Sequence, residues 1–199
     1  MSVIERHPLE PFLPENAWLL MLGSFPPSRK RWCMEFYYPN FTNDMWRVMG
    51  LVGFSDRDHF VDVGARRFRL DKIVGFLKER GIAIYDTATA VRRLKNTASD
   101  KDLEVAEPTD IGRLLLRLPG CTDIAATGEK AATTAAMQLD AAVPGVGTFS
   151  EGCVCGRTVR LWRMPSTSRA YPLAIEKKAE AYRRLLSYKF FNEELKGEK

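Results

Sequence analysis

The stretch AWLLMLGSFPPSRKRW (17–32) sets the architecture, because a continuous apolar run ends at a glycine and passes directly into a polar loop that contains prolines. A short run without helical periodicity is typical of a strand buried on both faces of a sheet. Three more runs along the chain share this character: IAIYD (82–86), TDIAAT (122–127) and TVRLWRM (158–164). Together with 17–23, they predict four central strands.

Helical sequence lies between and after these runs. Apolar residues recur there at helical spacing, and helix-ending residues such as Gly81 and Pro119 follow. Thr42 and Thr109 are candidate N-caps. The predicted helices cover 42–50, 71–80, 109–118, 129–139 and 172–190. Strands that alternate with helices predict right-handed crossovers and a four-stranded, mainly parallel sheet covered on both faces, which is a three-layer α/β/α sandwich.

The composition is that of a globular protein. The 199 residues fit a single domain, 1–199, with a core from about 17 to 187. Hydrophobic residues make up 45% and charged residues 28%, which excludes a largely disordered chain. No apolar stretch reaches membrane-spanning length and the start lacks a signal-like run, so we expect a cytoplasmic protein without membrane contact. The 4 cysteines lack paired zinc-site spacing, so we expect reduced thiols and no metal.

The loops after the four strands carry basic and small polar residues. Ligands of an open parallel sheet bind beyond the carboxyl ends of its strands, so these loops are the expected site. The basic residues are Arg29, Lys30, Arg31, Arg92, Arg93, Lys95, Lys130 and Arg169. The small residues are Ser24, Ser28, Gly128, Ser166, Thr167 and Ser168. Cations with hydroxyl and backbone donors favour a site for a polyanion, whereas ordinary solvated loops are the alternative.

The segment EFYYPNFTNDMW (35–46) places aromatic residues in a polar loop beside asparagines. Tyr38 and Phe41 are expected to cover the core. Near the carboxyl edge of a sheet, an aromatic ring can also stack on a base that has been flipped out of DNA. The candidates for that role are Phe25, Phe36 and Tyr37.

Three motifs in this order resemble the uracil-DNA glycosylase superfamily. They are LLMLGSFPPS (19–28), EFYYPNFTNDMW (35–46), and RMPSTS (163–168) followed by a long helix. The hypoxanthine-DNA glycosylase-like branch is the most similar, with its GS-(F/M)-P loop, its YY segment leading into an N-x-F-W element, and its closing PSTS loop. The resemblance spans about 17–187, and Asp86 and 128–131 match weaker features of the superfamily.

The resemblance implies a monofunctional DNA N-glycosylase of base-excision repair. It would flip out a deaminated base, uracil or hypoxanthine, and hydrolyse the N-glycosidic bond with a positioned water, without cofactor or metal. The expected partner is double-stranded DNA with a damaged or mismatched base, and we expect a monomer. Gly23, Ser24 and Phe25 would bind the base. The predicted DNA contacts are Ser28, Arg29, Lys130, Ser166, Thr167 and Ser168, with Arg169 or Tyr171 filling the gap left by the extruded nucleotide.

Two positions depart from the superfamily pattern. Phe25 stands where many members have an acid or amide that activates water, so the resemblance to the branch assigns that role to Asn43. Asp44 is an alternative base, and either residue can instead serve only the start of a helix. Met164 stands where efficient uracil enzymes have a histidine. His7 and His59 lie outside the motifs, and we expect them to be structural or exposed.

These departures keep two other classes open. One is a nucleic-acid-binding protein of the same fold with weak or no catalysis. The other is a small-molecule α/β hydrolase, although the sequence has no GxSxG elbow, no GxxxxGK(S/T) phosphate loop and no GxGxxG fingerprint.

Overall fold

The computed structural model describes residues 4–94 and 102–197, and side chains up to Ser187. Its centre is a five-stranded sheet in the order β5-β2-β8-β10-β9. The strands β2 (Leu19–Gly23), β5 (Ile82–Asp86), β8 (Asp123–Thr127) and β10 (Arg157–Met164) run parallel, which confirms the four predicted strands. The predicted total of four was wrong by one strand, because β9 (Phe149–Val154) pairs antiparallel with β10 at the edge.

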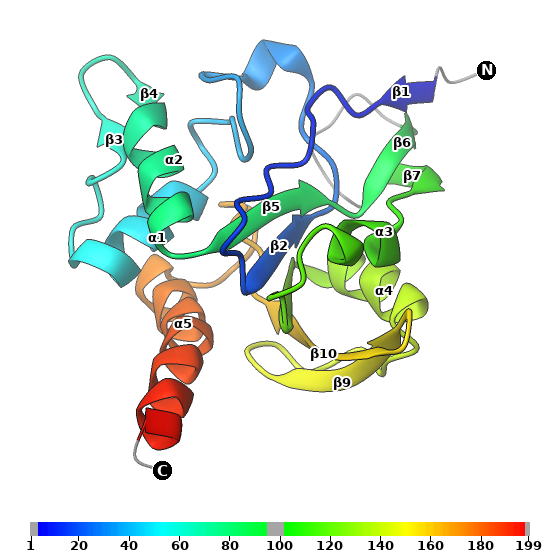
Figure 1. Cartoon of the computed structure of the whole chain (residues 1–199). Helices are drawn as coiled ribbons and strands as arrows, with labels where there is room; N and C mark the ends of the chain where they lie inside the picture. The colour runs from blue at the N-terminus through cyan, green and yellow to red at the C-terminus, as the bar shows by residue number, and fades with distance from the viewer. Residues whose placement is uncertain (1–3, 95–101, 198–199) are drawn as a thin grey trace.

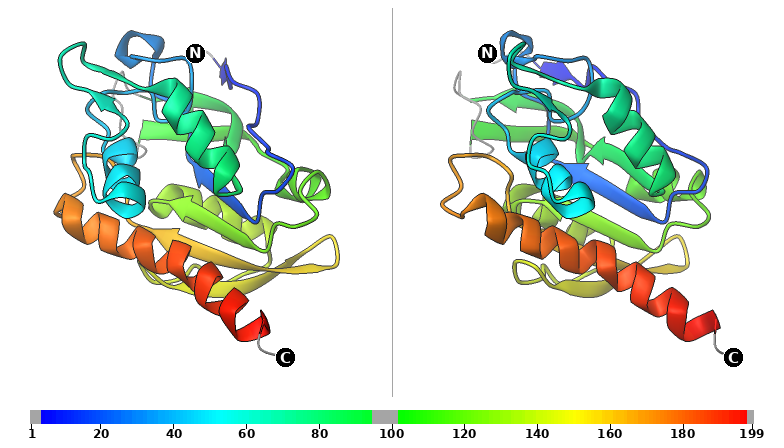
Figure 2. Two further views of the ribbon diagram at one scale, coloured as in Figure 1. Left: turned by 60° about the vertical axis from the view of Figure 1, so that its left-hand side comes forward. Right: turned by 90° about the vertical axis from the view of Figure 1, so that its left-hand side faces the viewer.

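The helices form a layer on each face of this sheet. They are α1 (Met45–Phe54), α2 (Leu70–Glu79), α3 (Ile111–Leu116), α4 (Glu129–Gln138) and α5 (Ile175–Gly197). Figure 1 shows α1, α2 and α5 on one side of the sheet and α3 and α4 on the other. In the right-hand view of Figure 2, the first group lies in front of the strands. The predicted three-layer α/β/α architecture is therefore confirmed.

Two predicted helix caps were wrong. Thr42 does not cap α1, because the N-cap position is Asp44, and Oδ1 of the preceding residue, Asn43, accepts the backbone N–H of Met45 at 2.8 Å. In α3 the cap is Asp110, whose side chain accepts the N–H of Arg113, while Thr109 Oγ1 donates to the carbonyl oxygen of Asp86 at 2.7 Å. The Asp110 contact is the usual capping interaction, whereas at α1 the N-cap Asp44 makes no side-chain capping bond and Asn43 satisfies the first N–H of the helix.

A second, smaller sheet stands beside the first. It pairs β1 (Ile4–Arg6), β6 (Ala88–Arg93) and β7 (Leu103–Pro108), all antiparallel, and Figure 1 shows it beyond the end of β5. The segment expected to be a loop at 87–96 is therefore largely the strand β6, and Lys95 lies outside the described residues. A short hairpin, β3 (Val61–Asp62) with β4 (Arg67–Phe68), precedes α2.

The core explains why the central strands are uninterrupted apolar runs. Every residue of β2, β5 and β8 is buried, since helices cover both faces of the sheet. Trp46 of α1 and Tyr182 of α5 are among the largest fully buried side chains and belong to the same hydrophobic cluster as these strands. In the described part of the chain, no helix combines the length and apolarity needed to cross a membrane.

Candidate functional site

A groove of about 1200 Å³ lies at the carboxyl ends of the parallel strands. Its walls come from residues within 23–27, 38–43, 127–134 and 163–172, and Asp86, Arg93 and Leu103 also line it. The segments 23–27, 38–43 and 163–168 belong to the three motifs singled out in the sequence. Segments that are far apart in the chain meet here because parallel strands end at one edge of the sheet.

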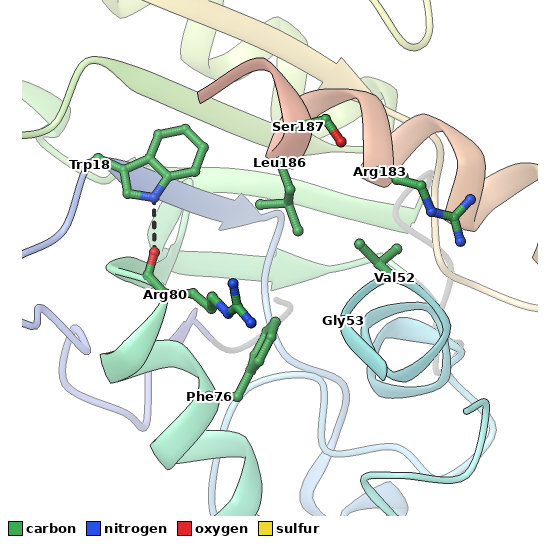
Figure 3. Close-up of a pocket in the computed structure, with 8 residues that line it drawn as sticks. All are labelled: Trp18, Val52, Gly53, Phe76, Arg80, Arg183, Leu186 and Ser187. Carbon is green, nitrogen blue, oxygen red and sulfur yellow. Dashed lines mark hydrogen bonds between the residues drawn. The ribbon is translucent and has the colours of Figure 1, made fainter. Parts of the chain in front are cut away.

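A second, smaller hollow lies at the opposite edge of the sheet, between α1, α2 and α5 (Figure 3). Its volume is about 130 Å³, and its lining is mostly apolar, with Trp18, Phe76 and Leu186 among the contributing side chains. Trp18 Nε1 donates to the carbonyl oxygen of Arg80 at 2.9 Å. Because the residues lining this hollow include no carboxylate, imidazole or thiol, the large groove is the candidate for chemistry.

The loop after β2 forms one wall of the groove. All of Gly23–Pro27 line it, which includes the predicted base-binding residues Gly23, Ser24 and Phe25. Arg93 of β6 supports this wall, because its Nη2 donates to the carbonyl oxygen of Pro26 at 2.7 Å and its guanidinium lies 5.7 Å from the Phe25 ring centroid. Gly23 is required by close approach, since a Cβ there would lie 2.3 Å from Asp86 Oδ1.

Asn43 lines the groove at the start of α1. Its Oδ1 accepts the N–H of Met45, the first residue of the helix. An amide oxygen has two lone pairs, so this contact leaves one acceptor direction for a water molecule. The contact with Met45 and a water-positioning role are therefore compatible at this residue.

Asp44, the alternative base, does not line the groove. It is 6% exposed, its Oδ1 accepts from Arg169 Nε at 3.0 Å, and its Oδ2 lies 3.5 Å from Lys178 Nζ. Its backbone N–H donates to the carbonyl oxygen of Thr167 at 2.9 Å. Asp44 thus joins the start of α1 to the loop after β10 as an ion-pair partner.

The loop after β10 brings Ser166, Thr167, Ser168 and Arg169 to the groove together. Ser166 Oγ accepts the N–H of Ser168, and Ser168 Oγ accepts the N–H of Ala170, both at 3.2 Å, so the two hydroxyls shape the loop. Thr167 is 1% exposed, and its Oγ1 has no hydrogen-bond partner among the described residues. The loop therefore contains a buried hydroxyl whose hydrogen-bonding capacity the described residues leave unused.

Cations outnumber anions around the groove. The charged residues that line it are Arg31, Arg93, Lys130, Arg163 and Arg169, against Asp86 and Glu129. Lys130 lies in the first turn of α4 and its Nζ donates to the carbonyl oxygen of Leu103. A concave surface with an excess of positive charge attracts a polyanion and concentrates it.

Besides Asp44, four more predicted site residues are not among those lining the groove. Phe36 packs edge-on against Phe12 and Tyr37, with centroid distances of 5.5 and 5.2 Å. Tyr37 is 2% exposed and its hydroxyl donates to the carbonyl oxygen of Glu10; burial, with a smaller effect of Asp86, raises the pKa of this hydroxyl. Ser28 and Arg29 begin a short 3-10 helix, where Arg29 pairs with Glu35.

Tyr38 lines the groove instead of Phe36 and Tyr37. Its hydroxyl donates to Thr127 Oγ1 at 3.1 Å, and Thr127 Oγ1 lies 3.2 Å from the hydroxyl of Tyr182. Tyr38 packs against the main core, as the sequence predicted, and it also lines the groove. Its backbone has a positive φ of 51°. Pattern alone could not assign which of the consecutive aromatic side chains faces the groove.

His7 and Lys178 contribute contacts that sequence reasoning missed. The side chain of His7 is 2% exposed, and its Nε2 lies 2.9 Å from Oδ2 of the groove residue Asp86. Lys178 is buried and its Nζ donates to the carbonyl oxygen of Ser168 at 2.9 Å. Both lie outside the motifs, so only the pairing of distant segments could reveal them. His59, by contrast, stacks on Phe54 with ring centroids 3.7 Å apart.

Comparison with known proteins identifies a solved structure with a similar fold. The sequence matches no family model and no curated protein. Among solved structures, the chain is similar to a Methanosarcina acetivorans protein that carries a provisional uracil DNA glycosylase name, with 24% identity and a TM-score of 0.63. The match covers 93% of this chain and 99% of that one. The chain therefore has the α/β fold of this uracil-DNA-glycosylase-like structure.

Proposed function

We propose that the protein is a monofunctional DNA N-glycosylase of the hypoxanthine-type branch, which acts as a monomer in base-excision repair and needs no cofactor. One observation carries this proposal. The GSFPP loop, the segment that ends at Asn43 and the PSTS loop are separate in the sequence, yet residues of all three line one groove at the carboxyl edge of the sheet. Double-stranded DNA with uracil or hypoxanthine is the proposed substrate.

The groove suits one nucleotide extruded from a duplex. Phosphate contacts dominate the affinity of proteins for DNA, and the excess of Lys and Arg around the groove supplies the matching charge. Hydroxyls and backbone N–H groups of 166–168 are further phosphate donors. Extrusion costs a few kcal/mol and is least costly for a mismatched or deaminated base, which favours such lesions before any base contact forms.

The reaction requires donors toward the base and a water at the sugar. In the proposed step, the water oxygen bonds to C1′ as the C1′–N bond breaks, the electron pair leaves with the base, and the water loses a proton to solvent. Backbone N–H groups of the GSFPP loop stabilise the charge that develops on the base, because dipoles fixed in place need no reorganisation during the reaction. Asn43 Oδ1 orients the attacking water.

A second candidate is a DNA-binding protein of the same fold without glycosylase activity. Two observations support it. Phe25 and Met164, which cannot donate or accept a proton, line the groove at the positions where the resemblance would place polar catalytic groups, and Asn43 Oδ1 already accepts the N–H of Met45. A binder of this kind would recognise distorted duplexes and leave the base attached.

One experiment separates the candidates. Labelled duplexes with a single uracil, hypoxanthine or xanthine, and an undamaged control, are incubated with excess protein, and abasic sites are counted after alkaline cleavage. A glycosylase releases the deaminated base in a single turnover and leaves the control intact. If the protein slows the migration of the duplexes but produces no abasic sites, the binding role is assigned instead.

A further inference from the structure

The carboxyl of Asp86 and the imidazole of His7 form a buried pair at the floor of the groove. Their side chains are 8% and 2% exposed, and His7 Nε2 lies 2.9 Å from Asp86 Oδ2. His7 follows directly after β1, and its backbone N–H donates to the carbonyl oxygen of Thr89 at 2.8 Å. The small sheet therefore brings a residue of the N-terminal arm to a site otherwise built from the central sheet.

The imidazole is held on several sides. Its Nδ1 accepts the backbone N–H of Leu9 at 3.2 Å and lies 2.9 Å from the carbonyl oxygen of the same residue, which leaves Nε2 as the nitrogen that donates to Asp86. Its ring contacts those of Tyr85 and Phe25 at centroid distances of 4.7 and 5.3 Å. A histidine with a restrained ring and a fixed partner on Nδ1 presents Nε2 in one direction. His7 can therefore determine the orientation of the group that Nε2 contacts.

The two oxygens of Asp86 have different surroundings. Oδ2 is bound to His7, whereas Oδ1 is the atom that lies nearest the position a side chain would take on Gly23. The backbone at Asp86 is also fixed, because its carbonyl oxygen accepts from Thr109 and the next residue, Thr87, donates to the carbonyl oxygen of Gly23 at 2.8 Å. Oδ1 is thus an acceptor held at a defined place beside the groove.

The depth of Asp86 indicates which part of a nucleotide it would meet. Asp86 ends β5 and is paired in register with Gly23, so it lies at the floor, while Asn43 and 166–169 come from the surrounding loops. The sugar of an extruded nucleotide stays attached to the strand and remains near the mouth. The hydrogen-bonding edge of the base, opposite the glycosidic bond, is the part that reaches the floor.

We propose that His7 is a positioning residue that fixes the Asp86 carboxyl so that Oδ1 accepts an N–H from the hydrogen-bonding edge of the extruded base. This inference rests on the proposed function and narrows its substrate class. Uracil and hypoxanthine both carry a ring N–H on that edge, where cytosine and adenine carry a lone pair. A fixed carboxylate oxygen accepts the N–H and repels the lone pair, so one group selects deaminated pyrimidines and purines alike.

The restraint by His7 is what makes the selection possible. Cytosine and adenine also carry an exocyclic amino group next to the lone pair, and a carboxyl free to rotate could turn toward it. With Oδ2 bound to His7, Oδ1 stays opposite the ring nitrogen. Loss of His7 is therefore expected to lower affinity for the deaminated base and to reduce the discrimination against the parent base.

The test compares His7→Leu, which removes the donor to Asp86, with His7→Gln, whose amide nitrogen can still donate. Asp86→Asn removes the anionic acceptor at nearly constant shape, and His59→Leu is a control at the other histidine. Binding is measured with duplexes that carry one 2′-fluoro nucleotide, which resists hydrolysis, with uracil, hypoxanthine, cytosine or adenine as its base. A duplex with an abasic analogue reports contacts that do not involve the base. Thermal melting confirms that each variant is folded.

Selectivity is defined as affinity for the deaminated base relative to the parent base. We expect His7→Leu and Asp86→Asn to lose tenfold or more of it while binding the abasic duplex like the unchanged protein, and His7→Gln and His59→Leu to retain it. If folded His7→Leu keeps its selectivity while the wild-type protein releases the base, the inference is overturned and the glycosylase proposal stands. If the wild-type protein neither releases nor prefers any deaminated base, both are overturned.

Discussion

The carboxylate of Asp44 lies 3.5 Å from the buried ammonium of Lys178, and the same ammonium donates to the carbonyl oxygen of Ser168. One cation of α5 therefore holds both the start of α1 and the loop after β10. Since Asn43 precedes Asp44 and Thr167 precedes Ser168, this contact fixes the relative position of two walls of the groove.

Replacement of Lys178 by Met should loosen that arrangement. Removing one partner of a buried ion pair costs about 3–5 kcal/mol, and the remaining contact of Asp44 with Arg169 should keep the loss near the lower end. Urea unfolding measures this change in the free energy of unfolding. Lys177→Met is the matched control, because Lys177 is exposed and pairs with Glu180 on the surface, so its loss should leave stability unchanged. Equal stability of the two variants would contradict a fixing role for Lys178.

Asn43→Ala should abolish base release and spare DNA binding, since the groove keeps its cations. The loss of a positioned water and of its orienting oxygen is expected to slow single-turnover release on the order of 100-fold or more. Loss of the hydrogen bond from the Met45 N–H should also cost about 1 kcal/mol of stability. Asn43→Asp keeps an oxygen for both contacts and serves as the comparison. Undiminished release from Asn43→Ala would remove Asn43 from the mechanism.

Arg169→Ala should weaken DNA binding and reduce its salt dependence. A phosphate contact contributes about 0.9 to the slope of log K against log salt concentration, so the slope should fall by about 1. Titrations at several salt concentrations supply the measurement. Arg184→Ala, an exposed arginine of α5 that pairs with Glu180, is the control and should leave the slope unchanged. A weaker affinity with an unaltered slope would point to a role in filling the duplex rather than in binding phosphate.

Gly23→Ala should disrupt the groove floor, because the new Cβ would meet Asp86 Oδ1 at 2.3 Å. Steric overpacking of this kind typically costs about 1–3 kcal/mol, and displacement of the Asp86 carboxyl should also remove activity. Gly75→Ala is the control, since Gly75 lies on the exposed side of α2 and no atom lies within 4 Å of the place where an alanine methyl would stand. That change should raise stability by up to about 1 kcal/mol. Thermal melting of both variants distinguishes the effects.

Stability should fall between about pH 9 and pH 12. Burial raises the pKa of the Cys121 thiol from 9.0 to about 12, and burial also raises the pKa of the Tyr182 hydroxyl. A group whose pKa is higher in the folded state stabilises the fold fully below its unfolded pKa, and this contribution is lost as pH rises toward the folded value. Urea unfolding at about pH 8 and about pH 10.5, below and within that window, measures the loss. A smaller loss in Cys121→Ala would assign part of it to this thiol, and an identical loss would exclude it.

The sequence predicted the central sheet and its helices because their signals are local. Each strand of the parallel sheet is a short apolar run, and the carboxyl ends of such strands must meet at one edge, which placed the groove. The small sheet could not be predicted in this way, since its register joins Ile4 to Arg92 across most of the N-terminal half of the chain. The individual residues of these strands carry no local sequence signal of that long-range pairing.

The candidate site was predicted only in part for a related reason. Residues of the GSFPP and PSTS loops reach the groove because the strands deliver them there. Within the segment of consecutive aromatics, however, Phe36, Tyr37 and Tyr38 all contact the core, and only Tyr38 of these three also lines the groove. The contact of His7 with Asp86 depends on tertiary pairing between residues 79 positions apart, which no local pattern contains.

The small sheet has its own hydrophobic cluster, formed by Ala88, Val91 and Leu103, and Phe25 packs against this cluster. One wall of the groove therefore rests on a unit with few buried contacts, and the other walls rest on the large core. Such small units open locally at a lower free energy than the whole protein. We expect amide hydrogens of β6 to exchange faster than those of β2. Nucleotide entry would then depend on the small sheet, and global unfolding on the large core.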